Sequence, residues 1–145
     1  MSDLPDLRDF VRVEPLPRTT VIIVRGGPDT AEKLRTHAQW VRRAFLLDGD
    51  QVLGISVFAA LDDIGPASLD AILSSKLSTY RVVHLVTAGQ LAEAGFKMLP
   101  TFGRPHMTLL ISGEDQVESL LEVLGTAQAN PRYGEMVRRQ RGGPS

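Results

Sequence analysis

The chain has 145 residues, of which 43% are hydrophobic and 23% charged, and its formal net charge is −1. This length suits one domain with a core of its own, and the near-neutral charge argues against a nucleic-acid surface spread over the whole domain. The chain has no cysteine, which excludes disulfides and thiolate catalysis and fits a cytoplasmic location. No apolar run approaches the roughly 20 residues of a membrane-spanning helix, so we expect a soluble protein without a membrane partner.

The sequence of the first third of the chain predicts an N-terminal arm, a strand and a helix. Residues 1–18 contain three prolines and are interpreted as an N-terminal arm that lies on the domain or on a partner. The β-branched run over 19–24 predicts a central strand, which turns at Arg25-Gly26-Gly27. Asp29 or Thr30 is a candidate N-cap for an amphipathic helix that ends near residue 44.

The remainder of the chain alternates predicted strands and helices. The sequence Asp48-Gly49-Asp50 predicts the turn of a β-hairpin, and Pro66 suits the first turn of a second helix. A buried strand is predicted over 80–86, followed by a short helix that Thr87 caps. The last strand is predicted over 106–111, and Gly125 ends a final helix.

These elements predict a single α+β or α/β domain over 19–126. The hairpin at 48–50 requires antiparallel pairing, so we expect a mixed sheet of five to six strands covered by three to four helices. A fully parallel doubly wound sheet is the alternative. Residues 127–145 are interpreted as a basic tail that is partly disordered.

The first candidate site is the turn after the first strand. Gly26 and Gly27 permit a close backbone approach, and the helix that starts near Thr30 favours an anion at its N-terminus. Arg25 would hold a phosphate or carboxylate through two hydrogen bonds. A tight turn with a solvated Arg25 explains the same residues without a ligand.

The second candidate site is a pair of histidines. His84 and His106 both lie in strands that are predicted to be central, and His106 shares a face with Thr108. If the two strands are neighbours, both imidazoles reach one cleft, where an acid, a base and Arg25 suit cleavage of a phosphodiester. Two half-buried histidines bonded to the backbone are the simpler alternative. Thr87 and Arg104 complete the set of predicted ligand-binding residues.

Two short segments resemble known families. The segment Pro105-His106-Met107-Thr108-Leu109 resembles the His-x-Thr signature of two-histidine phosphoesterases. That family carries two copies of the signature, and Leu85-Val86 after His84 do not provide the second.

Arg25 on a first strand, with Ser78-Thr79 before a later one, resembles the pattern of ADP-ribosyltransferases. The catalytic glutamate motif of that family has no counterpart here, because Glu118 and Glu122 fall on a predicted helix. Neither resemblance is adopted as an assignment.

The sequence thus leads to two hypotheses. In the first, the protein binds a phosphate-bearing ligand, RNA or a nucleotide, and as an enzyme it would cleave phosphodiesters like a toxin-like effector. In the second, it is a non-catalytic subunit that holds protein partners, or a second copy of itself, through its arm, its tail and a sheet edge. The basic residues Arg138, Arg139 and Arg141 of the tail would contact nucleic acid or an acidic partner. No motif predicts a metal or a cofactor.

Overall fold

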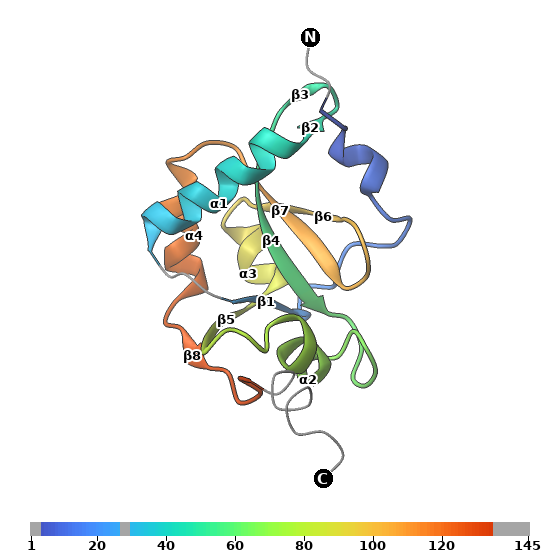
Figure 1. The fold of residues 1–145 in the computed structure, drawn as a ribbon, viewed down its shortest axis with the longest axis vertical. Coiled ribbons are helices and arrows are strands. Elements are labelled where there is room, and N and C mark those ends of the chain that lie inside the picture. The colour runs from blue at the N-terminus through green and yellow to red at the C-terminus, as the bar shows by residue number, and fades with distance from the viewer. Residues whose placement is uncertain (1–3, 27–29, 135–145) are drawn as a thin grey trace.

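The computed structural model describes residues 4–26 and 30–134 of the chain (Figure 1). In chain order its elements are η1 (Leu7–Phe10), β1 (Ile22–Gly26), α1 (Ala31–Ala44), β2 (Leu46–Leu47), β3 (Asp50–Gln51), β4 (Leu53–Ala60), α2 (Leu69–Ala71), η2 (Ile72–Lys76), β5 (Val82–Thr87), α3 (Ala88–Glu93), β6 (Lys97–Pro100), β7 (His106–Ile111), α4 (Gln116–Leu124) and β8 (Gln128–Ala129). None of the helices in the described ranges is long and apolar enough to cross a membrane.

The main sheet has six strands in the order β6-β7-β4-β1-β5-β8. The predicted α+β class and number of strands are therefore confirmed. Every neighbouring pair is antiparallel, so the predicted mixture of parallel and antiparallel pairs does not form. The reason is that no helix links two neighbouring parallel strands. Helix α1 leads into the β2–β3 hairpin. Helix α3 follows β5 and leads to β6, which is an edge strand on the other side of the sheet and does not pair with β5.

The predicted turn at residues 48–50 is present. Asp48 and Gly49 have φ angles of 52° and 87°, which is the left-handed conformation that a two-residue hairpin turn requires. The hairpin is shorter than expected, because β2 pairs with β3 over only two residues in a separate sheet. Strand β4 pairs instead with β1 and β7 in the main sheet.

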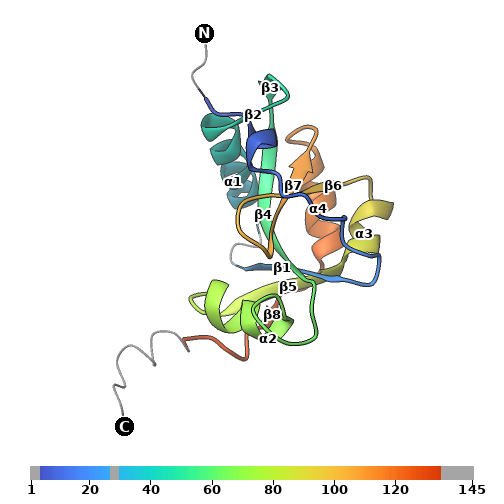
Figure 2. The ribbon, with the colours of Figure 1, turned by 90° about the vertical axis from the view of Figure 1, so that its right-hand side faces the viewer.

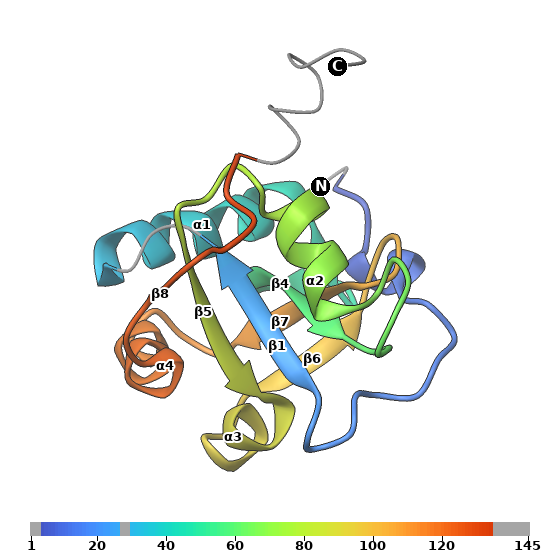
Figure 3. The ribbon, with the colours of Figure 1, turned by 90° about the horizontal axis from the view of Figure 1, so that it is seen from below.

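The two faces of the main sheet are covered unequally. The larger hydrophobic cluster joins one face to α3 and α4 and to Leu34 of α1, and it includes Ile23, Leu91 and Leu120; all four residues are at most 1% exposed. Helix α1 also packs on the other face, where its Val41 lies beside Gly54 and Thr108. The smaller cluster joins part of the other face to the α2–η2 segment. In Figure 3, β1 and β5 run through the middle, with α2 on one side and α3 and α4 on the other. We call these the large-core face and the small-core face.

Both ends of the described chain are fixed to the domain. In the arm, Leu7 is 1% exposed, and the Asp6 carboxylate accepts hydrogen bonds from the backbone of Asp48 and Gly49. The sequence predicts a tail from residue 127 onward, but residues 128–134 belong to the domain and include strand β8. Asn130 there is 5% exposed, and its amide donates to the Leu77 carbonyl at 2.9 Å. The predicted tail residues 135–145, with their arginines, lie outside the described residues.

Candidate functional site

Two of the predicted site residues form a buried pair. Arg25 of β1 and His84 of β5 stand directly opposite each other in the β1–β5 register, so their side chains share the large-core face. They are 4% and 1% exposed. Arg25 donates to the carbonyl of Gly26 at 2.7 Å, and burial is the main cause of its lowered pKa. The pair therefore lies inside the domain, away from the surface where a phosphate would bind.

His106 lies on the opposite face of the sheet. Its register partner is Phe58, which in turn pairs with Val24, and Val24 is one residue out of phase with Arg25. Strands β4 and β1 separate His106 from His84. The predicted cleft shared by both imidazoles is thus not formed, because it required neighbouring strands and a common face. The individual roles of His84, His106 and Arg25 stay predictions.

Hydrogen bonds fix the orientation and the tautomer of His106. Its Nδ1 lies 3.2 Å from the carbonyl oxygen of Thr101, which can only accept, so Nδ1 carries the proton. The Thr101 hydroxyl lies 3.0 Å from the same Nδ1 and 2.7 Å from the hydroxyl of Thr108. The Nε2 atom of His106 has no hydrogen-bond partner among the described residues. It therefore keeps a lone pair that is available to accept a proton or a hydrogen bond.

Aromatic side chains extend from His106 across the surface. Its ring lies 5.2 Å from that of Phe102 and 5.5 Å from that of Phe58, both edge to face. Further ring contacts of 5.3–6.4 Å join Phe102 to Phe10 and Phe45, and join Phe45 in turn to Phe10 and to Trp40 of α1. We define the aromatic surface by these six residues: Phe10, Trp40, Phe45, Phe58, Phe102 and His106.

Three rings of the aromatic surface are open to solvent. Trp40 is 59% exposed, Phe10 39% and Phe102 37%. These rings do not come from one local sequence motif, since they are contributed by η1, α1 and the β6–β7 loop. Sequence reasoning missed this surface, because its rings lie far apart in the chain and no local pattern brings them together.

Two cationic residues, Arg12 and Lys76, act on His106. Burial is the main cause of the lowered pKa of His106, and the charges of Arg12 and Lys76 lower it further, while the bond to Thr101 opposes them. Arg12 donates to the carbonyls of Thr101, Phe102 and His106 and pairs with Glu14 at 2.7 Å, so it organises the β6–β7 loop. Lys76 is exposed and forms no ion pair among the described residues.

His37 on α1 has a structural role that the sequence did not reveal. Strand β4 pairs with β1 only over Phe58–Ala60, and the upstream N–H of Ser56 donates to Nε2 of His37 at 3.2 Å. Burial, together with the charges of Arg25 and His106, lowers the pKa of His37 to about 4. His37 is therefore neutral at pH 7, in the form that accepts this bond.

The other predicted ligand-binding residues support the fold. Thr30 caps α1, and Thr87 forms a capping box with Gln90 at the start of α3. Arg104 pairs with Asp62 at 2.9 Å, which occupies its guanidinium. A side chain at Gly26 would meet the ring of Tyr80, so this glycine permits close packing.

Gly27 lies outside the described residues. Within 4–26 and 30–134, no three His, Asp or Glu side chains gather closely enough to hold a metal ion.

The structure is therefore an α+β protein with a surface of aromatic rings around His106, whose Nε2 has no hydrogen-bond partner among the described residues. Comparison with models of known protein families, with curated proteins and with solved structures gives no match for this chain.

Proposed function

We propose that this protein binds a phosphate-bearing ligand with a planar ring, a nucleotide or single-stranded RNA, on the aromatic surface. The observation that supports this is the group of exposed rings around His106, together with the cation of Lys76, whose charge acts on His106. Proteins that bind single strands combine aromatic side chains, on which bases stack, with cations that contact the phosphates. The missing cysteines fit a ligand found in the cytoplasm.

Each part of the surface has a distinct role in this proposal. Trp40 and Phe102 provide exposed rings for stacking, and Lys76 provides a cation for a phosphate. His106 offers Nε2 as a hydrogen-bond acceptor or proton acceptor, since its Nδ1 is held by Thr101. If the bound RNA is cleaved, Nε2 of His106 is the base that would take the proton of the attacking hydroxyl.

The experiment is a titration of fluorescein-labelled oligouridylate with the full chain, followed by anisotropy and repeated with ADP as competitor. We expect Phe102→Ala to weaken binding about tenfold, because one stacked base contributes roughly 1–3 kcal/mol. Lys76→Gln should lower the dependence of log Kd on log salt by about one. A gel of the same samples reports any cleavage of the labelled RNA.

Tyr133→Ala is the matched control. Tyr133 is 40% exposed, as open as Phe102, but it lies outside the aromatic surface, beside Arg81. Binding should survive this change. If neither RNA nor ADP binds, or if Tyr133→Ala weakens binding as much as Phe102→Ala, the proposal is wrong. The hypothesis of a non-catalytic interaction subunit would then be the better one.

A further inference from the structure

The outer edge of β6 is only half covered. The arm pairs with its end, because the N–H of Arg12 donates to the Pro100 carbonyl at 2.7 Å and the N–H of Phe102 donates to the Phe10 carbonyl at 3.0 Å. Figure 2 shows η1 and the arm, in blue, beside β6 and β7, with α3 nearby. This edge of the sheet therefore already accepts an added extended segment from the chain itself.

The open half of the edge presents backbone groups of Met98. In an antiparallel ladder, alternate residues direct both N–H and C=O toward the same neighbour. The Pro100 carbonyl points away from β7 to Arg12, so the groups of Met98, two residues earlier, point outward as well. No described residue bonds to them. A row of such groups is a template for another strand.

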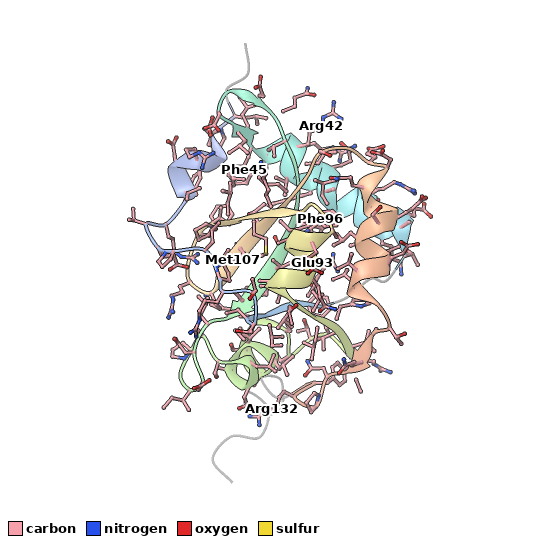
Figure 4. The ribbon with its side chains drawn as sticks, turned by 180° about the vertical axis from the view of Figure 1, so that it is seen from behind. Arg42, Phe45, Glu93, Phe96, Met107 and Arg132 are labelled. Carbon is pink, nitrogen blue, oxygen red and sulfur yellow. The ribbon has the colours of Figure 1, made fainter. Side chains whose placement is uncertain are left out.

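An apolar cavity of about 610 Å³ runs along this open half. Its lining comes from β6 and from the segments around it, and it includes Arg8, Ala88, Ala92, Phe96, Lys97 and Met98. The view from behind in Figure 4 shows Phe96 and Glu93 at α3. The volume lies within the range of cavities that bind ligands.

The two sides of β6 differ in chemistry. On the large-core face the cavity is lined by Ala88, Ala92 and Phe96, which are apolar. On the small-core face it carries the exposed Lys97, which forms no ion pair among the described residues. Arg8 of η1 also lines the cavity and is paired with Asp48. Successive side chains of a strand point to opposite faces. A strand that alternates apolar and acidic residues would therefore match both sides at once.

We propose that β6 binds an extended peptide segment of a partner protein, in which apolar and acidic residues alternate, as an added strand centred on Met98. The outward N–H and C=O of Met98 require a polar partner, which a peptide backbone supplies and an aliphatic lipid chain does not. A second copy of this chain fits less well. Antiparallel pairing of two β6 strands about Met98 would place two Lys97 side chains diagonally on one face.

The probe is a fluorescein-labelled octapeptide of alternating valine and aspartate, and its counterpart alternates valine and lysine. The full chain should bind the aspartate peptide about tenfold or more tightly than the lysine peptide, because only the former matches Lys97. Hydrogen exchange should show slower exchange of the Met98 amide when the aspartate peptide is bound.

Two variants test the geometry. Met98→Pro removes the outward N–H at an edge position that tolerates proline, and it should weaken binding about tenfold, whereas Met98→Leu should retain it. Ala92→Trp fills the cavity from an exposed position and should have a similar effect. Glu93→Trp is its matched control, since Glu93 is also exposed on α3 but does not line the cavity. If Met98→Pro does not fold, the comparison of peptide binding by Ala92→Trp and by Glu93→Trp tests the proposal instead.

Four results would overturn the inference. The first is equal binding of the two peptides, and the second is an equal effect of Ala92→Trp and Glu93→Trp on peptide binding. The third is that the protein binds decanoate but not the aspartate peptide. The fourth is a dimer in sedimentation that Met98→Pro dissociates, because the edge would then bind a second copy. None of these variants lies on the aromatic surface, so binding of RNA should be unchanged in each.

Discussion

On the large-core face of the sheet, His84 is 1% exposed beneath packed helices, whereas on the small-core face His106 is half-buried and keeps Nε2 accessible. Both histidines lie in six-residue strands, His84 inside β5 and His106 at the first position of β7. They differ in which face the register gives them and in how far helices cover that face. A histidine in a strand is therefore only a candidate for catalysis or binding, and the helices that cover its face of the sheet determine whether a ligand can reach it.

The largest expected effect is on the two isoleucines of β1. Ile23 faces the large core and is 1% exposed, whereas its neighbour Ile22 faces the small core and is half-buried. Ile23→Ala should lower the free energy of unfolding by about 2–5 kcal/mol, and Ile22→Ala by about 1–2 kcal/mol, because less cavity is left behind. Urea denaturation measures both. Equal losses would mean that the two faces are packed equally.

The two histidines should separate stability from binding. His84→Ala should lower the free energy of unfolding by about 2–3 kcal/mol, because it removes buried volume. Its affinity for RNA should stay within about twofold of that of the unmodified protein. His106→Ala should cost less than about 1 kcal/mol and weaken RNA binding about tenfold or more. Denaturation and anisotropy on the same samples check this. A loss of binding in folded His84→Ala would bring the buried pair back as the ligand site.

Acid should destabilise the fold through His37. Its pKa in the fold is about 4, below the ordinary value of 6.5, so the unfolded chain binds more protons between these values. The contribution of His37 to the free energy of unfolding is fully present above pH 6.5 and is lost as the pH falls toward 4. After allowance for partial exposure, the loss is about 1–2 kcal/mol. Denaturation at a series of pH values measures it.

His37→Gln is the control for this pH effect. The glutamine carbonyl can still accept the bond from Ser56, but the side chain does not titrate. The slope of stability against pH should become shallower, with the remainder due to groups such as His106, whose pKa is also lowered. An unchanged slope would show that His37 is not the source of the loss of stability in acid.

The smallest expected effect concerns Thr87. Its hydroxyl accepts from the N–H of Gln90, so Thr87→Ala should cost about 1 kcal/mol, the usual loss for an N-cap. Binding of RNA and of the peptide should not change. Thr87→Ser, which keeps the hydroxyl, should restore most of the stability. Weaker RNA binding in Thr87→Ala would assign this residue a place in a ligand site.

Local features were determined by the sequence alone. Ile22 to Val24 of the β-branched run lie in a strand as predicted, although this strand begins later than residue 19 and continues through Arg25 and Gly26, where a turn was expected. Thr30 and Thr87 cap their helices with the hydroxyl groups that the sequence places there. The Asp48-Gly49 turn forms because these residues tolerate positive φ angles. Each of these depends on neighbouring residues, so the information lies within a few positions of the chain.

Only the tertiary structure decided which strands are neighbours and which face each side chain takes. Alternation shows that His106 and Thr108 share a face, but it relates no strand to another, so the separation of His84 from His106 was not predictable. The aromatic surface likewise joins Phe10, Trp40 and Phe102, which are far apart in sequence. The physical reason is that strand order and register follow from burying the whole core at once, a condition that no local segment contains.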